Sequence, residues 1–458
     1  MKNRFFLGAT AFLGLFYTLD ARAAGTALDV QGARATGMAG ATTAFIDDAS
    51  SIYFNPAGMA NGKGLDAQAG VNLIAPTFNY KSNATGKKTT MPFSVVTPFQ
   101  IYASYGITDN ISAGVGFFTP FGLDLKWPDG WEGRGQITQA SLRTYVINPT
   151  VSVRFLDNRI KLGAGLQIMR GTVELQRDIN FGTQYGHVDL GGGTWGVGAN
   201  GGVQIEAIKQ YLLLGVTYRS AVRLNFDDGN AHFSNVPPAF QGQIFDGKVT
   251  TSTNQPDQVA MAIATHPTKN LVIDAEAVWL GWGKFHSIDI NFPNNPALST
   301  HEPKNWDNRV NFHLGGEYTI NPHWQARAGA MYDPSPSPPS TLGPDIPDAN
   351  RLNLALGATY KADCGFFVDA GYQFINLFAK KSTNPNFSGE AGGIVNILAV
   401  SVGFTQNRKP VSTMAPPPEP MPTDPGTPPD GSAPPPSAPP PQTTPPGDAP
   451  PPPPPANN

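Results

Sequence analysis

The sequence predicts an all-β fold: a 14-stranded antiparallel transmembrane β-barrel, with an N-terminal hatch that plugs it and a disordered, proline-rich C-terminal tail. Three observations lead to this prediction. The chain begins with the features of an export signal, apolar and polar residues alternate through most of its 458 residues, and short and long connections follow one another in strict turn. Alternation with period 2 indicates strands, and asymmetric connections on an exported chain are typical of outer-membrane barrels.

Residues 1–23 are predicted to be a signal peptide. Lys2 and Arg4 are basic, and residues 5–17 are apolar. Ala21-Arg22-Ala23 matches the small-residue pattern at which such peptides are cleaved. A retained membrane anchor is the alternative. No later segment reaches about 18 consecutive apolar residues, which excludes a transmembrane helix.

The composition excludes several classes of function. The formal net charge is −3, so neither nucleic acid nor another polyanion is expected as a partner. The single cysteine, Cys364, excludes a disulfide framework and a cysteine-based zinc site. Neither a Gly-x-Ser-x-Gly nor a His-Glu-x-x-His motif occurs. We therefore predict no enzyme activity, no catalytic residues, no metal and no cofactor.

Residues 24–64 are predicted to fold inward as the hatch. They are rich in small and turn-forming residues and lack period 2, whereas a barrel of fourteen strands leaves a lumen that wall side chains alone do not fill. At the centre are Asn55, Pro56, Ala57 and Gly58, where Pro56 removes a backbone donor and Gly58 permits unusual backbone angles. We interpret this stretch as a gating element; a helix-capping turn without a gating role is the alternative.

Residues 65–405 are predicted to form the barrel. In one run, Leu271, Ile273 and Ala275 share a face, and Asp274 and Glu276 share the opposite one. Many runs have the length that a tilted transmembrane strand needs, and aromatic residues often stand at their ends. About fourteen runs start near Leu65, Val95, Ile111, Tyr145, Ile160, Trp195, Leu212, Gln258, Leu271, Val310, Trp324, Arg351, Gly365 and Ile394.

The connections predict the orientation of the barrel. Short turns are expected on the periplasmic side, with both chain ends, and long loops on the outside of a Gram-negative outer membrane. A soluble β-sandwich is the alternative. The long loops cover roughly 78–92, 120–142, 171–193, 227–256, 283–308, 334–350 and 377–393.

Residues 411–458 are predicted to be a disordered periplasmic tail. The low-complexity sequence from Ala415 to Asn458 is rich in proline and contains no Lys or Arg, which favours an extended polyproline II conformation. Such a tail is long enough to reach a periplasmic or cell-wall partner. An inert extension is the alternative.

Five ordered blocks resemble the FadL family of outer-membrane transporters of long-chain fatty acids and other hydrophobic compounds. "GARATGMAGATTAFIDDASSIYFNPAGM" is similar to the family's hatch, and "FFTPFGLDLKWPDGWEGRG" to its second long loop. "LLGVTYRSAVRLNFDDG", "DAEAVWLGWGKFHSIDINF" and "ARAGAMYDPSPSPPSTLGPDIPDANR" resemble three later blocks. The resemblance implies a monomer, surrounded by outer-membrane lipid, that takes up a hydrophobic small molecule passively. A general diffusion porin for polar solutes is the alternative function.

Candidate ligand-binding residues follow from apolar loops and from the resemblance. Dense apolar side chains on loops usually mark binding, although a loop–loop core is the alternative. They are Phe117, Phe118, Phe121, Leu123 and Trp127 in the second long loop and Phe240 and Phe245 in the fourth.

The resemblance also implies a lumenal cation that holds a fatty-acid carboxylate. Arg170 is the first candidate and Arg177 the second, with a wall ion pair as the alternative role. Where the family has a second cation, this chain has Asp307, and Lys304 lies nearby. A carboxylate at that point favours a neutral hydrocarbon or aromatic cargo.

The third strand is predicted to open toward lipid. Glycine in a strand often marks a bend, and proline cannot donate to the ladder. The resemblance implies lateral exit of cargo through this strand, which contains Gly114, Gly116 and Pro120.

Overall fold

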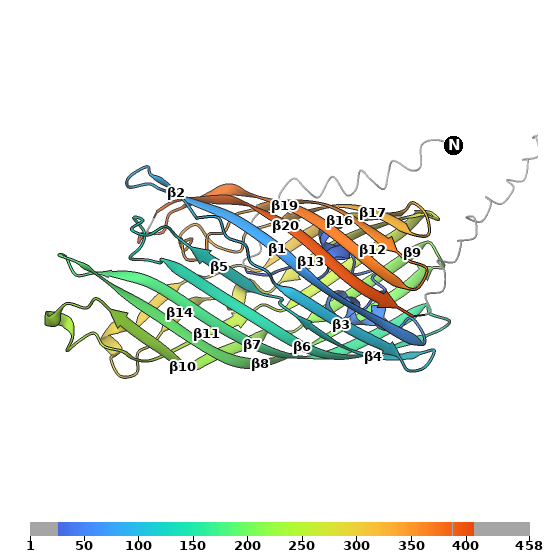
Figure 1. Ribbon diagram of the computed structural model, residues 1–458, viewed down its shortest axis with the longest axis horizontal. Coiled ribbons are helices and arrows are strands. Elements are labelled where there is room, and N and C mark those ends of the chain that lie inside the picture. Colours follow the sequence, from blue (N-terminus) through green and yellow to red (C-terminus); the bar gives the residue numbers. More distant parts are fainter. Residues whose placement is uncertain (1–25, 387, 407–458) are drawn as a thin grey trace, which may run out of the picture. The chain divides into compact units, whose positions relative to one another are not determined.

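The computed structural model describes residues 26–386 and 388–406, which form a closed antiparallel barrel around a short helical hatch (Figure 1). The predictions of a signal peptide at 1–23 and of a tail at 411–458 lie outside the described residues. Among the described residues, no helix is both long and apolar enough to cross a bilayer.

The barrel wall crosses fourteen times, as predicted. Eighteen strands form one sheet, and four of the crossings are each split into two strands. The crossings are, in chain order, β1 (Gly64–Ser82), β2 with β3 (Lys88–Thr90 and Phe99–Gly106), β4 with β5 (Ile111–Phe118 and Gly122–Lys126), β6 (Gln139–Phe155), β7 (Ile160–Asn180), β8 (Tyr185–Ile208), β9 with β10 (Leu212–Arg219 and Val222–Ser234), β11 with β12 (Gly247–Gln255 and Gln258–Thr268), β13 (Leu271–Leu280), β16 (Arg309–Thr319), β17 (Trp324–Asp333), β18 (Arg351–Lys361), β19 (Phe366–Ser382) and β20 (Gly389–Thr405).

The last crossing closes on the first. β1 pairs with β20 from Asp66↔Thr405 to Ser82↔Gly389, and on its other edge it pairs with β3. Closure matters because hydrocarbon offers no hydrogen bonds to an open strand edge.

The alternating pattern has its apolar face outside, as a lipid-exposed wall requires. On β20, Leu398, Val400 and Val402 are exposed, whereas Ala399 and Ser401 are buried. Apolar side chains thus face lipid, and small or polar side chains face the lumen.

Several strands extend further than the sequence pattern predicts. β6, β8 and β20 start five or more residues before the predicted runs near Tyr145, Trp195 and Ile394. The added residues lie on the long-loop side, where no lipid imposes alternation, so they form strands without the period-2 signal. One predicted loop contains a separate hairpin of β14 (Ser287–Ile290) and β15 (Thr300–Pro303).

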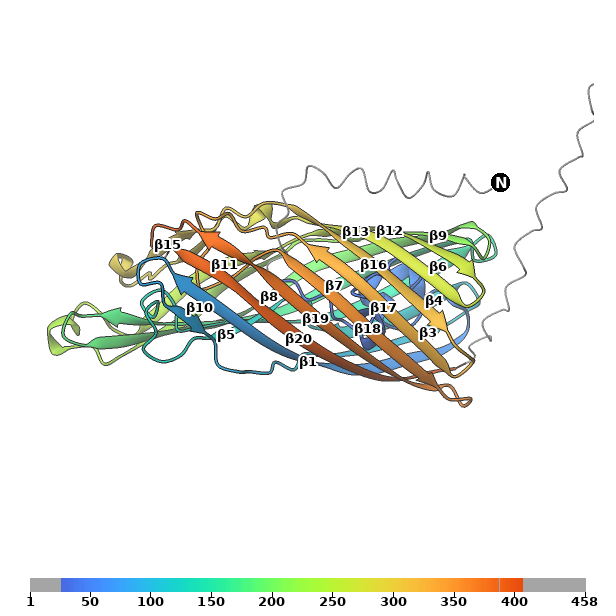
Figure 2. The same ribbon diagram turned by 90° about the horizontal axis from the view of Figure 1, so that it is seen from above.

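The hatch occupies the lumen nearer the end with the short turns (Figures 1 and 2). It contains α2 (Ala33–Thr36), α3 (Ser51–Phe54) and the 3-10 helix η2 (Pro56–Met59). Most of its residues between 26 and 60 are buried. Three further 3-10 turns lie in the loops, namely η3 (Pro238–Phe240), η4 (Trp282–Lys284) and η5 (Pro296–Leu298).

Candidate functional site: the hatch and an apolar cavity

An ion-pair network joins the hatch to the wall. Arg34 of α2 lies 2.9 Å from Glu317 of β16, and Glu317 lies 2.6 Å from Arg327 of β17. Arg34 also pairs within the hatch with Asp47 at 2.7 Å and with Asp48 at 2.8 Å. The Glu317 carboxylate therefore links one hatch cation to one wall cation.

Acidic side chains of β13 bind the hatch backbone. Glu276 accepts hydrogen bonds from the amide nitrogens of Thr42 and Thr43 at 3.2 and 3.1 Å, and Asp274 accepts one from the amide of Ala44 at 3.3 Å. The polar face that alternation predicts for this strand is thus the face that holds the hatch.

The Asn55 side chain makes hydrogen bonds both within the hatch and to the barrel wall. Its side-chain oxygen accepts from the Ala57 amide at 3.2 Å, which caps η2. Its side-chain nitrogen donates to the carbonyls of Thr43 and of Val203 on β8, both at 3.0 Å. Asn55 therefore caps η2, the role given above as the alternative to gating, and it also ties the hatch directly to the barrel wall.

Replacing Asn55 with alanine is expected to destabilise the protein by roughly 1–3 kcal/mol, because two buried carbonyls lose their donor. Thermal unfolding in detergent would measure this. Asn83→Ala, in an exposed loop, is the matched control and should have little effect. Equal losses in the two variants would contradict a special role for Asn55.

Two wall residues that lie directly against Asn55 and Pro56 are glycines. A Cβ on Gly163 of β7 would lie 2.3 Å from the Pro56 carbonyl carbon, and one on Gly202 of β8 would lie 2.1 Å from the Asn55 side-chain oxygen. Gly163 and Gly202 are also direct partners in the β7–β8 ladder. Only a residue without a side chain allows the hatch this close to the strands.

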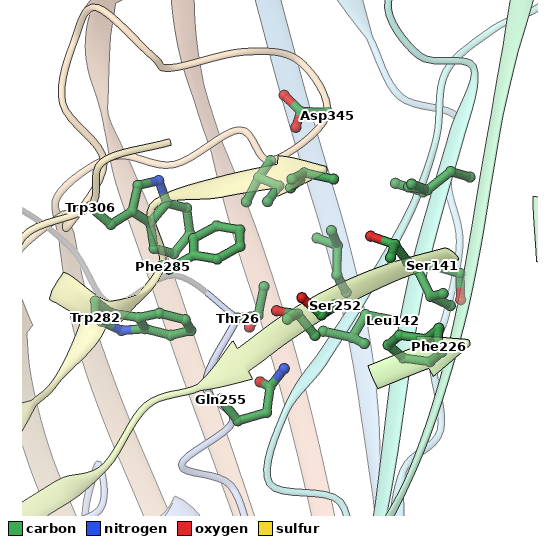
Figure 3. Close-up of a pocket in the computed structure, with 18 residues that line it drawn as sticks. Thr26, Ser141, Leu142, Phe226, Ser252, Gln255, Trp282, Phe285, Trp306 and Asp345 are labelled. Atoms are coloured by element: carbon green, nitrogen blue, oxygen red, sulfur yellow. The ribbon is translucent and has the colours of Figure 1, made fainter. Parts of the chain in front are cut away.

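An apolar cavity of about 90 Å³ lies beyond the hatch, on the long-loop side. Trp282, Phe285 and Trp306 form an aromatic wall, with ring centroids 4.9 Å apart in edge contacts between Trp306 and each of the other two (Figure 3). Leu142 and Phe226 lie on the facing side (Figure 3). None of the described residues that line this cavity is Lys, Arg or His.

The predicted aromatic residues of the third strand and its loop separate into different places. Phe117 stacks on Phe99 at 5.2 Å on the outer face of β4, so it does not line the lumen. Phe118 and Phe121 are buried inside against the hatch, and Phe118 contacts Tyr53 at 5.1 Å.

Of the other predicted loop residues, only Leu123 lines the cavity. Trp127 stacks on Trp131 at 4.6 Å and donates to the Pro344 carbonyl, which is the loop–loop core described above as the alternative. Phe240 and Phe245 are exposed in the loop between β10 and β11.

The prediction that Arg170 faces the lumen is wrong. Arg170 is paired with Trp195 across the β7–β8 ladder, and directly opposite residues share a face. Trp195 is 59% exposed on the outer surface, and the Arg170 guanidinium lies 5.5 Å from its ring centre. Met169, one residue earlier, points inward and is fully buried.

The other two cation candidates lie in the loop region. Lys304 is 2.5 Å from Asp345 and 3.6 Å from Glu302. Burial alone would lower the pKa of Lys304, but the two carboxylates outweigh it and raise the pKa above its usual range. The positive charge of Arg177, near the end of β7, also attracts the Glu302 carboxylate. Lys304 is thus neutralised by protein acids.

The third strand is interrupted at Thr119–Phe121, so Pro120 lies at the break, whereas Gly114 and Gly116 are paired on both edges. The hatch fills this break. Leu28 donates to the Pro120 carbonyl at 2.9 Å, and the Gly122 amide donates to Thr26 at 3.0 Å.

The aromatic wall of the cavity was not among the residues predicted from sequence. Trp282 and Phe285 belong to the block "DAEAVWLGWGKFHSIDINF", which carried a family signal without a role for either ring. Trp306 precedes Asp307, the position at which sequence analysis considered only charge.

Comparisons with known proteins agree on one family. The family model "Outer membrane protein transport protein (OMPP1/FadL/TodX)" matches residues 14–405. A long-chain fatty acid transport protein of Escherichia coli O6:H1 is 24% identical over 375 residues, which cover 73% of this chain and 82% of that protein. A putative outer membrane protein of Neisseria meningitidis serogroup B is 23% identical over 82% of this chain and 90% of its own.

Solved structures show the same fold at low sequence identity. The chain is similar to a Pseudomonas aeruginosa FadL homologue with a TM-score of 0.75 and 19% identity, over 83% of this chain and 99% of that chain. It is similar to the P. putida toluene transporter TodX with a TM-score of 0.67 and 14% identity, over 85% of this chain and 100% of that chain.

Proposed function

The chain belongs to the OMPP1/FadL/TodX family of outer membrane transport proteins, and from this premise we propose that it takes up small uncharged hydrophobic molecules, such as monoaromatic hydrocarbons, by passive diffusion. The observation that carries the proposal is the cavity beside the hatch. The described residues that line it are mainly aromatic and aliphatic, with several Ser and Thr, one Gln and one Asp among them and no cation. Relatives include a protein named for fatty acids and one named for toluene, so the family alone leaves the cargo open.

Charge argues against a fatty acid as the cargo. A carboxylate that leaves water for an apolar cavity needs a cationic partner, or it costs several kcal/mol. Among the described residues, Asp345 is the only charged one that lines the cavity, and it would repel a carboxylate. Lys304, which pairs with this Asp345, is also bound to Glu302.

Size and shape favour a single ring. An apolar protein cavity of roughly 150 Å³ stays dry and binds benzene, and the volume here, about 90 Å³, is of the same order. Trp282, Phe285 and Trp306 contact one another edge to face. A further aromatic ring in the cavity can pack against these rings in the same edge-to-face geometry.

Toluene binding by the purified protein tests the proposal. In Trp282→Ala it is expected to weaken about five- to thirtyfold, because loss of the ring removes roughly 1–2 kcal/mol of contact. Trp195→Ala, on the outer surface, is the matched control and should bind normally. Calorimetry with toluene and with oleate would measure both. Tight oleate binding that excludes toluene, with no effect of Trp282→Ala, would contradict an uncharged aromatic cargo.

The porin alternative makes an opposite electrical prediction. With the hatch seated among buried side chains, the wild-type protein is expected to show no large steady conductance in planar bilayers, whereas a diffusion porin conducts continuously. Steady porin-like current through the wild-type protein would favour the alternative.

A further inference from the structure

The barrel wall is also interrupted between β8 and the seventh crossing, which is split into β9 and β10. Ladder pairs between β8 and the seventh crossing stop at Asn200↔Arg219 and resume only at Gly191↔Asn230. The Ser220 amide donates to the Ala199 carbonyl at 2.8 Å, and the Ala199 amide donates to the Ser220 hydroxyl at 2.9 Å, which ties the lower end of this boundary. Above this tie, among the residues that the structure describes, no ladder pair joins residues 192–198 of β8 to residues 221–229. We call this unpaired boundary the seam.

Side chains fill the seam in place of backbone hydrogen bonds. Val222 and Leu224 of β10 are buried, and each lies within 3.0 Å of the position a Cβ on Gly196 would take. Leu224 reaches past β8 to within 2.6 Å of the same position on Gly171 of β7. β10 therefore bends into the lumen here, and the glycines of β8 provide the space for it.

The seam adjoins the cargo cavity. A smaller apolar cavity of about 20 Å³ is lined by Gly191, Gly192 and Gly229 at the upper end of the seam. It shares lining residues with the larger cavity, among them Phe226 and Val173. A molecule that moves from the larger cavity to the seam would therefore have to displace side chains only. The Phe226 ring, which lines both cavities, is one of them.

We propose that the seam is a second lateral portal, through which hydrophobic cargo moves between the cavity and the outer leaflet of the membrane. The proposal rests on the proposed function. Along this boundary the strands are held by apolar packing, so a flat apolar molecule can part them by displacing side chains without breaking ladder hydrogen bonds. At the break in the third strand, by contrast, the way is occupied by Thr26–Leu28, which are hydrogen-bonded to the strand edge.

The height of the lower end of the seam agrees with exit at the membrane surface. Gly198 lies ten residues above Ile208, where β8 ends at its short turn. At a rise of about 3.4 Å per residue and a tilt of about 45°, this is roughly 24 Å along the barrel axis, close to the top of an apolar band about 25 Å tall. Trp195, beside the seam and exposed, is where an interfacial aromatic belongs. Unpaired strand edges at this level can reach water and lipid head groups, which the membrane interior would not allow.

A reversible staple across the seam tests the portal. In a background with Cys364→Ser, Gly198→Cys and Val222→Cys place a disulfide there, since a Val222 methyl lies 2.8 Å from the Cβ position on Gly198 and the other close atoms are side chains. Toluene uptake into cells or vesicles is expected to fall to the background level when the staple is oxidised and to return on reduction. Val216→Cys with Met261→Cys, an exposed pair on the fully laddered β9–β12 boundary, is the matched control and should not respond.

The outcomes separate the portal from the proposed function. Unchanged uptake with a verified staple would overturn the portal, whereas absence of toluene binding by the unstapled protein would contradict the proposed function itself. Leu224→Ala supplies an opposite test, because removing the side chain that packs against Gly196 and Gly171 should raise uptake. Uptake that stays at the wild-type level in this variant would also count against the portal.

Discussion

Glu317→Ala is expected to lower the free energy of unfolding by roughly 3–5 kcal/mol, the range for removal of one partner of a buried ion pair. Glu317 binds Arg34 of the hatch and Arg327 of the wall at once. Both guanidinium groups are largely buried, and the substitution would leave two cations near one another without the carboxylate between them. Their desolvation cost stays while the compensating attraction is lost.

The contacts that Arg34 and Arg327 keep in the variant indicate which of them loses more stabilisation. Arg34 keeps Asp47 and Asp48, both within 2.8 Å. Arg327, which is 1% exposed, keeps one carboxylate, Asp369, at the longer distance of 3.5 Å, and its hydrogen bond to the neutral Gln325 side chain at 3.1 Å. The wall therefore bears most of the penalty, and the hatch loses its ionic tie to β16.

Thermal unfolding in detergent would measure the loss, and limited proteolysis would report release of the hatch. Asp228→Ala is the control, since Asp228 is 95% exposed and lies 4.0 Å from Lys248, a pair worth little in water. A Glu317→Ala protein as stable as this control would show that the network contributes no net stability.

The fold was predictable because lipid imposes a strict rule on every crossing. The alternation near Leu398 and near Leu271 reports which side chains meet hydrocarbon, and fourteen repetitions make a weak local signal decisive. The family match confirms the predicted outer-membrane location. Strand ends were less predictable because β8 continues to Tyr185, beyond the lipid, where no alternation is required.

The functional site was less predictable because it depends on which face of a strand each side chain occupies and on contacts between residues far apart in sequence. In "LQIMRGTVELQR", apolar residues occupy both faces of the strand, so the pattern does not decide whether Met169 or Arg170 points inward, and a shift of one residue reverses the answer. The cavity combines Leu142, Phe226 and Trp282, which lie far apart in sequence. The breaks in the third and the seventh crossing differ in the same way: Pro120 is visible in the sequence, whereas the break at Ser220 carries no proline or glycine of its own.

Gly163→Val is expected to unseat the hatch, with a stability loss at or above the upper end of the roughly 1–3 kcal/mol typical of overpacking. A Cβ on Gly163 would lie 2.3 Å from the carbonyl carbon of Pro56 and 2.5 Å from the amide nitrogen of Ala57. Both are backbone atoms of a helix that starts at a proline, so they cannot rotate aside as a flexible side chain would.

Relief of this clash requires the 3-10 helix to move away from β7, which breaks the Asn55 bond to the Val203 carbonyl. We therefore expect channel-like current in planar bilayers where the wild-type protein shows none, together with proteolytic cleavage near residue 55. Gly201→Val is the matched control: Gly201 pairs with Ala164 beside the same site, but the nearest atom to its Cβ position is a carbonyl oxygen at 3.5 Å, so the variant should stay closed. If Gly163→Val were as stable and as silent as Gly201→Val, the hatch would not be seated on the wall at Pro56. Its position would then rest on other ties, such as the Arg34–Glu317 pair and the bonds from Glu276 to its backbone.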